Sequence, residues 1–348
     1  MIHPLRIVHA AQFQFKKCGD RYFSSDMKFH QGLVRLGHLV YPYSINDMAR
    51  MHSPFNSKPW GRRGTNRDLV KTCSNVRPQL LMLGHAQSIS LDTLLACRQA
   101  VPGMKIALWY VDPLWARKDT EHLYARRAAL DAIFVTTAGP LLADIAAPGC
   151  PTAFIPNPVD PSIETGRNFE LPAADFEYDF IFLGSVRNEP ERAHYIQTLH
   201  DRLHDRLRLG LFGCMGNPFI FGDRREHVLS HSRMALNLSR RNDVLLYSSD
   251  RMAQLVGNGL LTFSADSAGF QDLLAPDEMV YFHDPDDLVE KILHYSRDDT
   301  AWRETARRGH AKIHRTCSSD VIAKYMIDVV FGNPEAGDVE WPVHLYQR

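Results

Sequence analysis

The sequence predicts an α/β protein with two parallel-sheet halves. Short apolar runs alternate with helical stretches along the chain, which is typical of parallel α/β layers. The alternation stops in the polar, acidic residues 161–178 and restarts at Asp179. At 348 residues the chain is also too long for one typical core. We therefore expect an N-terminal domain, a linker, a second domain, and a C-terminal helix and tail that could pack back on the first domain. Their expected ranges are 1–160, 161–178, 179–316 and 317–348.

Six strands are expected in the first half, because six short apolar runs are bounded by polar or turn residues. They are Leu5–Ala11, His38–Tyr43, Leu80–Leu83, Ile106–Val111, Ala132–Thr136 and Thr152–Ile155. Ser24 or Ser25 can cap a helix that runs to Leu36 and ends at Gly37. Further helices are expected over 91–100, 118–129 and 141–146. Residues 44–66, rich in Ser, Asn, Pro, Arg and Gly, predict a long loop.

The same alternation predicts five strands in the second half. They are Asp179–Leu183, Leu207–Phe212, Met234–Leu238, Leu260–Phe263 and Val280–Phe282. The helices expected between and after them are 190–206, 223–230, 249–256, 268–274, 285–296, 299–314 and 318–331. Residues 332–348 contain Pro and Gly and predict a tail.

Composition narrows the class of protein. Lys+Arg and Asp+Glu balance at 40 each, so no global basic field favours nucleic acid, and we expect no nucleic-acid partner. Six scattered cysteines form no CxxC pair and indicate neither a disulfide framework nor a zinc site. No signal peptide or membrane-spanning apolar run is visible. These features predict a cytoplasmic protein, with contact at the inner face of a membrane left open.

The segment Tyr247-Ser-Ser-Asp-Arg251 indicates an anion site. Ser248 or Ser249 can cap the helix that follows, which leaves its first amides and positive dipole end for an anion. A cation such as Arg251 is unfavourable on a first turn unless an anion approaches. The segment therefore predicts a seat for a diphosphate. The alternative is an ordinary helix start whose arginine meets a neighbouring carboxylate.

Several segments together resemble the GT-B glycosyltransferases. Phe182-Leu-Gly184-Ser185 and the block from Ser230 to Phe282, continuing to Thr316, resemble their C-terminal nucleotide-sugar domain. The chain looks most like family-4-like and spore-maturation (CgeB-like) transferases. Trp109–Pro113 and Ile155–Asp160 resemble the first domain more loosely. The resemblance implies two Rossmann-like domains facing a cleft. It also implies sugar transfer from a nucleotide-diphosphate sugar to a glycan, lipid-linked or other hydroxyl acceptor, in polysaccharide or glycoconjugate synthesis.

The resemblance also implies roles for donor-site residues. Gly184 and Ser185 would approach the donor phosphates, and Gly213 would lie near the nucleobase of the donor. The helix start, with Tyr247, Ser248, Ser249 and Arg251, would cradle the diphosphate. Gln254 stands where relatives carry a glutamate that binds the ribose. An amide forms hydrogen bonds without charge, so donor binding and the stereochemistry of transfer stay open.

Leaving-group stabilisation needs cations or amides at the diphosphate. Arg187, just past Gly184-Ser185, is the candidate second cation; otherwise it pairs with Glu189 or Glu191. The acidic pairs Asp286-Asp287 and Asp298-Asp299 lie beside expected helices, as N-capping or surface residues, so we expect a reaction without metal, and with no cofactor beside the donor sugar nucleotide.

An inverting transfer also needs a base from the first half. Asp20, His85 and Asp112 are the candidates, because each follows a strand. In other readings His85 caps the next helix, or contacts the donor sugar in a retaining reaction, and Asp112 is a turn residue. The 44–66 loop, with Trp60, could meet an acceptor or a membrane. A sugar-nucleotide epimerase and a non-catalytic binding subunit stay open as alternatives to a transferase.

Overall fold

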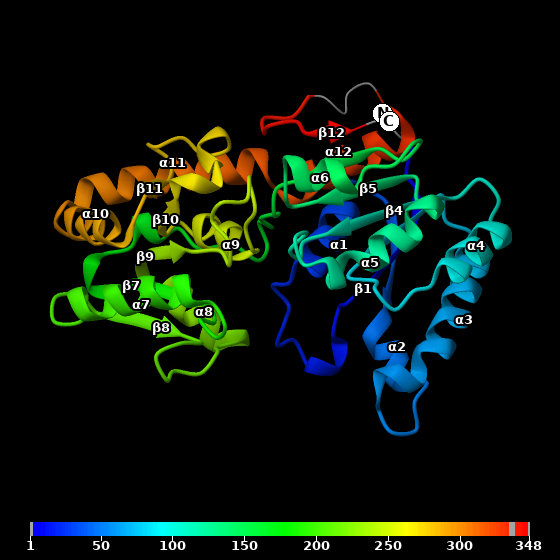
Figure 1. The fold of residues 1–348 in the computed structure, drawn as a ribbon, viewed down its shortest axis with the longest axis horizontal. Coiled ribbons are helices and arrows are strands. Elements are labelled where there is room, and N and C mark those ends of the chain that lie inside the picture. Colours follow the sequence, from blue (N-terminus) through cyan, green and yellow to red (C-terminus); the bar gives the residue numbers. More distant parts are fainter. Residues whose placement is uncertain (1–2, 334–337, 347–348) are drawn as a thin grey trace. The chain divides into compact units, whose positions relative to one another are not determined.

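The computed structural model describes residues 3–333 and 338–346, which divide into two compact units (Figure 1). Of these residues, unit 1 contains those up to Pro158 and those from Ser319 onward, apart from 340–342. Unit 2 contains Val159–Ser318 together with 340–342. Residues 161–178, expected as a linker, lie within unit 2, where the side chains of Phe169 and Phe176 are part of the hydrophobic core.

Unit 1 contains a seven-stranded sheet in the order β12-β6-β5-β4-β3-β1-β2. All neighbours are parallel except β12, which runs antiparallel to β6. The strands are β1 (Arg6–Ala11), β2 (Leu39–Ser44), β3 (Leu80–Gly84), β4 (Lys105–Tyr110), β5 (Ala132–Val135), β6 (Thr152–Phe154) and β12 (Leu345–Tyr346). The six strands expected in this half are all present. The tail expected over 332–348 was wrong in one respect, because it contains the strand β12. This strand is too short for its pattern to be read from the sequence.

Helices and short 3-10 turns connect the strands of unit 1. They are η1 (Phe15–Lys17), α1 (Ser25–Arg35), α2 (Ile45–Met51), α3 (Lys58–Val76), α4 (Leu91–Ala100), α5 (Arg117–Arg126), η2 (Arg127–Ala129), α6 (Pro140–Ile145) and α12 (Ser319–Phe331). The side chain of Ser24 accepts a hydrogen bond from the Met27 amide, which confirms the expected cap of α1.

The long loop expected over 44–66 was wrong, because α2 and the first part of α3 occupy most of these residues. The buried residues of α3 are Gly61, Thr65, Leu69 and Cys73, spaced four apart, so the buried stripe is narrow and mostly small. At Gly61 an added Cβ would lie 1.6 Å from the Ala49 carbonyl oxygen of α2. Because the buried face of α3 is narrow and consists mostly of small residues, the rest of its sequence is polar. The hydrophobic periodicity that would predict a helix is therefore weak.

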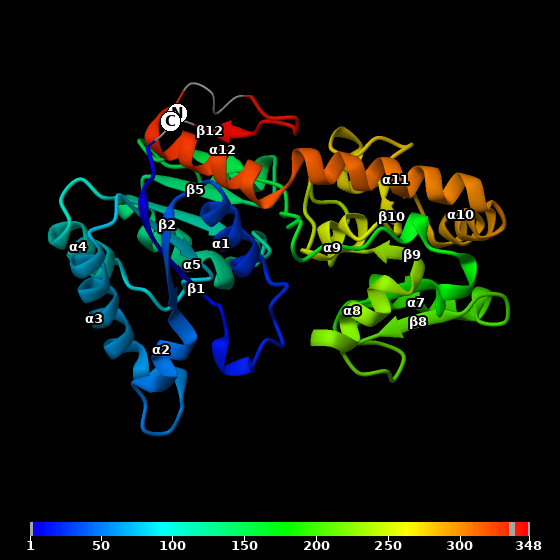
Figure 2. The same ribbon diagram turned by 180° about the vertical axis from the view of Figure 1, so that it is seen from behind.

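Helix α12 packs beside α1 in unit 1 (Figure 2). A Cβ added at Gly32 of α1 would lie 2.1 Å from the carbonyl oxygen of Ser319. The Arg35 guanidinium also donates to the Ser319 hydroxyl at 3.0 Å. The first turn of α12 therefore contacts the last turn of α1. None of the helices in the described ranges is long and apolar enough to cross a membrane.

Unit 2 contains a five-stranded parallel sheet in the order β11-β10-β9-β7-β8. The strands are β7 (Tyr178–Leu183), β8 (Leu209–Phe212), β9 (Ser232–Asn237), β10 (Leu261–Ala265) and β11 (Val280–Phe282). The α-helices are α7 (Pro190–Leu203), α8 (Gly222–Ser230), α9 (Arg251–Gly257), α10 (Pro285–Arg297) and α11 (Asp299–Thr316). The short helix expected over 268–274 is instead two 3-10 turns, η5 (Asp266–Ala268) and η6 (Phe270–Asp272), because Gly269 between them has a positive φ of 73°.

Candidate active site

The carboxyl end of β3 brings His85 against Asp26 in unit 1. His85 directly follows β3, and Asp26 lies in the first turn of α1. The Nδ1 atom of His85 is 3.0 Å from Oδ2 of Asp26 and 3.2 Å from Oδ1. Asp26 is buried and also accepts a hydrogen bond from the Gln12 amide at 2.8 Å. A buried carboxylate therefore orients the imidazole and directs its Nε2 away from the helix.

His85 and Asp26 each favour the charged form of the other. Burial disfavours the charged form of His85, but the Asp26 carboxylate, with a smaller effect of Asp112, raises the pKa of His85 above its ordinary value. Burial likewise opposes ionisation of Asp26, yet His85 and the Gln12 amide lower the pKa of that carboxyl. An ionised Asp26 beside a histidine is the arrangement that lets the imidazole accept a proton near neutral pH.

The backbone of His85 is held in an uncommon conformation. Its φ is 47°, in the left-handed region that non-glycine residues rarely adopt. Such a residue costs about 1–3 kcal/mol and persists only where its surroundings enforce it. Here the Gln12 side chain donates to the His85 carbonyl at 2.9 Å. The Trp109 ring packs edge-on against the imidazole, with ring centroids 5.1 Å apart. A strained residue clamped in this way is a candidate for function.

The other two predicted bases, Asp112 and Asp20, differ in their relation to His85. An oxygen of Asp112 lies 3.9 Å from Nε2 of His85, and the Asp112 side chain is 47% exposed. Asp20 lies in the turn after η1, and it is not among the described charges that shift the pKa of His85. Asp26 was missed from the sequence, where it reads only as an acidic residue favourable to a helix start. The catalytic roles of all of these residues stay predictions.

A second histidine, His9, is buried beside Trp109 and is neutral. Nε2 of the buried His9 accepts a hydrogen bond from the Trp109 indole at 3.2 Å. Its ring stacks on His30, with centroids 5.8 Å apart. Burial, reinforced by His30, lowers the pKa of His9 to about 3. His9 therefore stays uncharged near neutrality and serves Trp109 as an acceptor.

In unit 2, Arg251 joins the ends of two strands. Its guanidinium donates to the Leu183 carbonyl at 2.8 Å and to the Leu238 carbonyl at 2.9 Å. It also lies over the Phe182 ring, 5.2 Å from the centroid. Carbonyl oxygens, rather than the neighbouring carboxylate considered above, accept its hydrogen bonds. Arg251 thereby fixes the loop after β7 that begins with Gly184.

The expected cap of the following helix was wrong. Helix α9 begins at Arg251 with Asp250 at the N-cap position, and no side-chain capping bond forms there in the described part of the chain. The Ser248 hydroxyl instead donates to the Ser249 carbonyl at 2.6 Å. Tyr247 is buried, and its carbonyl accepts from the Ser239 hydroxyl at 3.2 Å. These local bonds compete with capping, as serine side chains often do.

Two further arginines lie close to Arg251, and one of them contacts the same loop. Arg192 of α7 is buried, and it donates to the Ser185 carbonyl at 2.8 Å. Arg225 of α8 is buried too. Burial, together with the charges of Arg192 and Arg225, lowers the pKa of Arg251 to about 9. We call Arg192, Arg225 and Arg251 the arginine cluster. Three guanidiniums whose charges oppose one another form a setting that an anion would stabilise.

The arginine cluster was only partly found from the sequence, although a signal was present. Arg192 shares the buried face of α7 with Tyr195, Ile196 and Leu199. Arg225 shares that of α8 with Val228 and Leu229. A charged residue on the apolar face of a predicted helix is rarely buried without a reason. Position along the helix, rather than sequence motif, would have identified both residues.

Both the oxygen and the nitrogen of the Gln254 side-chain amide form hydrogen bonds. Arg225 donates to its side-chain oxygen, and its side-chain nitrogen donates to a carboxylate oxygen of Asp250. Gln254 is itself buried. The amide therefore joins α8 to the start of α9. Its expected contact with a donor ribose stays a prediction.

The remaining predicted donor residues lie where β7 and β8 end. At Gly213, φ is 80°, and an added Cβ would lie 2.6 Å from the Phe219 ring and 3.0 Å from the Gly184 carbonyl. Only glycine fits that approach. The backbone amide of Arg187 donates to the Ser185 hydroxyl at 3.1 Å, and Arg187 is exposed. Glu189, one expected partner of Arg187, lies 3.5 Å from Arg240 instead.

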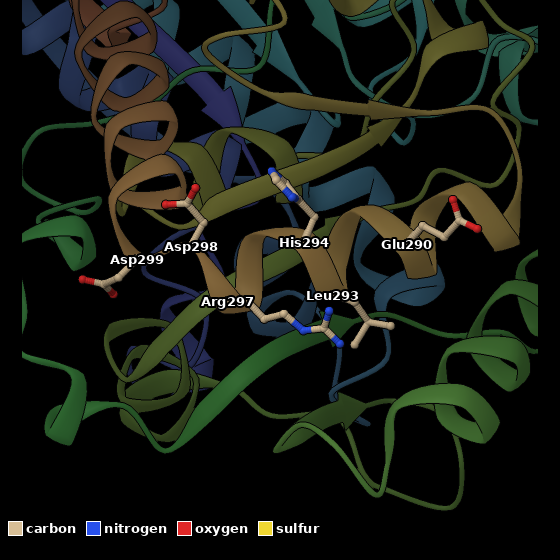
Figure 3. Close-up of a pocket in the computed structure, with 6 residues that line it drawn as sticks. All are labelled: Glu290, Leu293, His294, Arg297, Asp298 and Asp299. Carbon is tan, nitrogen blue, oxygen red and sulfur yellow. The ribbon is translucent and has the colours of Figure 1, made fainter.

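A separate depression lies on unit 2 where α10 meets α11 (Figure 3). Its lining residues are Glu290, Leu293, His294, Arg297, Asp298 and Asp299. Asp298 caps α11 by accepting from the Ala301 amide, and Asp299 accepts from the Trp302 indole at 3.0 Å. These acids are used in building the helix start. Across residues 3–333 and 338–346, no cluster of His, Cys, Asp and Glu is arranged to hold a metal ion.

One family of known proteins matches part of the chain. Residues 183–328 match a family described as "Glycosyl transferase-like", a segment that contains the whole arginine cluster. No curated protein matches the chain by sequence. This segment of the chain is therefore similar to glycosyl transferases.

Solved structures establish the architecture. An alpha-glucosyltransferase in complex with UDP-glucose and DNA aligns over 94% of this chain and 100% of its own, at 11% identity and a TM-score of 0.62. The sucrose-phosphate synthase of Thermosynechococcus elongatus aligns over 94% and 98%, at 12% identity and a TM-score of 0.61. Anabaena HepE in complex with UDP and glucose aligns over 94% and 100%, at 10% identity and a TM-score of 0.58. At such identities the likeness is one of fold, and that fold is GT-B.

Proposed function

We propose that the protein transfers a sugar from a nucleotide-diphosphate sugar to a hydroxyl acceptor. The observation that carries the proposal is that the charges of Arg192 and Arg225 act on Arg251, and that Arg192 and Arg251 hold the Gly184-Ser185 loop, inside the glycosyl transferase-like segment. A diphosphate would offset the repulsion among these charges, and in departing as leaving group it would keep the same stabilisation.

One atom of the arginine cluster supports this further. Nε of the buried Arg192 has no hydrogen-bond partner among the described residues. An unsatisfied buried donor costs about 1–3 kcal/mol. A phosphate oxygen at the Ser185 loop would supply the missing acceptor. Exposed Arg187 on the same loop is the second proposed phosphate contact. We propose a uracil nucleotide, since UDP or UDP-glucose is bound in several structures of the same fold.

His85 is the proposed catalytic group of unit 1. In an inverting transfer its Nε2 would take the acceptor hydroxyl proton while Asp26 stabilises the imidazolium. In a retaining transfer the same nitrogen would contact the donor sugar. We propose that neither route uses a metal or a cofactor beside the donor. The acceptor class, whether glycan, lipid-linked or another hydroxyl, and the CgeB-like grouping belong to the same proposal.

Donor binding is tested by calorimetric titration with UDP, in the presence and absence of EDTA. We expect saturable binding that EDTA leaves unchanged. Arg187→Ala should weaken it about tenfold, as expected for one charged hydrogen bond, without lowering the melting temperature. The matched control is Arg206→Ala, also exposed but in the turn before β8, which should bind UDP like the wild type. Absence of binding to UDP and to every other nucleoside diphosphate would refute the proposal.

Turnover is tested separately with a panel of sugar nucleotides and acceptors. His85→Gln should lower transfer by ~10² or more while UDP binding persists, and Asp20→Asn should not. Unchanged transfer in His85→Gln would remove His85 from the mechanism. Conversion of the donor without any acceptor would instead identify an epimerase. Binding without conversion would identify a binding subunit.

A further inference from the structure

Four large apolar side chains are exposed at one end of unit 1. Phe55 and Trp60, in and just after the turn between α2 and α3, are 75% and 73% exposed, and they contact each other with ring centroids 6.4 Å apart. Met51, at the end of α2, is 69% exposed. Phe15, in η1, is 54% exposed. Figure 1 shows the α2–α3 turn beyond the strand ends of its own sheet.

Hydrogen bonds join η1 to α2 and to the α2–α3 turn, so the four exposed side chains belong to one surface. The Phe15 amide donates to a carboxylate oxygen of Asp47 in α2 at 2.8 Å. The Lys16 ammonium donates to the side-chain oxygen of Asn56, next to Phe55, at 3.2 Å. The exposed apolar groups therefore belong to a built surface. We call this surface, formed by Phe15–Lys17, Met51, Phe55, Lys58, Trp60 and Arg63, the apolar–basic tip.

The charge of the tip is one-sided, although the whole chain is balanced. Residues 44–67 carry five Lys and Arg, and their one acidic residue, Asp47, is buried. Among the described residues, no carboxylate pairs with Lys17, Lys58 or Arg63. Cations around exposed aromatic and thioether groups suit a surface that is anionic outside and apolar beneath.

The tip also lies on the same edge of the sheet as His85. Residues of α3, which follows the turn, contact the loop that leaves β3: the Arg62 guanidinium and the Asn66 amide both donate to the Ser88 carbonyl, at 2.9 and 3.1 Å. Ser88 is three residues beyond His85. A surface held by the tip would therefore lie on the His85 side of unit 1.

We propose that the apolar–basic tip docks the protein on the anionic headgroup surface of a membrane, with Phe55 and Trp60 inserted at the level of the headgroups. Aromatic side chains with one polar edge are favoured at that depth. The basic residues around them add attraction to anionic lipid. This inference concerns a surface apart from the donor residues, and it stands or falls independently of sugar transfer.

The test is sedimentation of the full chain with vesicles, using phosphatidylcholine alone or mixed with phosphatidylglycerol. We expect binding to the mixed vesicles, with a partition coefficient that falls at least ~10-fold in Phe55→Ser/Trp60→Ser. Lys58→Glu/Arg63→Glu should fall by a similar factor. Leu39→Ser, at an exposed apolar residue elsewhere in unit 1, is the apolar control. Arg206→Glu/Arg307→Glu, which changes net charge equally, is the charge control. Both controls should bind like the wild type.

Each other outcome overturns the inference. These are absence of vesicle binding, equal binding to neutral and mixed vesicles, and equal losses in tip and control variants. A dimer in solution that Trp60→Ser dissociates would assign the tip to self-association. Binding to a duplex oligonucleotide, lost in the same tip variants, would assign it to nucleic acid. UDP titration of the tip variants separates these results from failure of the proposed function, since donor binding should be unchanged in them.

Discussion

The imidazole Nδ1 of His85 lies 3.0 Å from the carboxylate of Asp26, although 59 residues separate the two in the chain. One residue follows a strand and the other begins a helix, and the parallel sheet places both at the same edge. The pair combines an orienting carboxylate, a ring clamped by Trp109, and a second imidazole nitrogen facing Asp112. It is the part of unit 1 best built for proton transfer.

Replacing Asp26 by Asn should lower the pKa of His85 to below about 6.5, because burial then acts on the imidazole against only the smaller effect of Asp112. In the wild type, the stability contributed by charged His85 is present below about 6.5 and is lost as pH rises through its raised pKa. That pH dependence should disappear in the variant. NMR titration of the His85 ring, with unfolding measured across the same pH range, checks both effects.

Asp112→Asn is the control for this change, because Asp112 is farther from the ring and half exposed. It should lower the pKa of His85 less than Asp26→Asn does. The opposite order would contradict the assignment of Asp26 as the orienting group.

His9→Gln should reduce the loss of stability in acid. The pKa of His9 is lowered to about 3, so the unfolded chain takes up a proton that the folded protein does not. Stability is therefore fully present above about 6.5 and is lost as pH falls toward 3. A glutamine keeps an acceptor for the Trp109 indole but does not titrate. Between pH 7 and pH 4, wild type should lose about 2–3 kcal/mol more than the variant in urea titrations. The same substitution at exposed His194 should give no such difference.

Gly84→Ala should destabilise unit 1 and disturb His85. An added Cβ would lie 2.0 Å from Cζ2 of Trp109, where neither backbone nor indole has room to move. Overpacking of this kind costs about 1–3 kcal/mol. The loss should be smaller in a Trp109→Phe background, which lacks the clashing atoms. Gly103→Ala, with open space but a φ of 85°, controls for backbone strain alone. Equal costs at Gly84 in both backgrounds would exclude the clash as the cause.

Gln254→Leu should affect stability more than nucleotide binding. The change removes the hydrogen bonds to Arg225 and Asp250, which costs about 1–3 kcal/mol in a buried setting. The affinity of the folded protein for UDP should change less than about threefold. Gln197→Leu, which loses one exposed bond to Asp201, should be close to neutral. Abolished binding at unchanged stability would instead make Gln254 a donor ligand.

Much of the fold could be predicted because apolar strands and caps leave local signals. The strands of both sheets other than β12, and the Ser24 cap, are of this kind. Helix α3 was not predictable in this way, because its buried stripe of Gly61, Thr65, Leu69 and Cys73 carries little hydrophobic pattern. Its stability comes from contact with α2 and α4, which no local window contains.

The candidate site was predictable to the extent that single residues follow strands. His85 and Gly184 were found by that rule. Asp26 and Arg192 were not, because each acts through a partner distant in sequence and resembles an ordinary helix residue until that partner is known. The cap expected from Ser248 or Ser249 was wrong for a related reason, since Asp250 rather than either serine takes the N-cap position of α9.

The chain leaves unit 1 at Pro158 and returns to it at Ser319, where α12 packs against Gly32 of α1. A ribosome makes the chain from its N-terminus, so every residue of the unit 2 sheet has emerged before α12 exists. Domains generally fold as units during synthesis. Unit 2 can therefore reach its native state first, while the helix that carries Asp26 waits for the last helix to be translated. In a newly made molecule the arginine cluster would be ready before the His85–Asp26 pair.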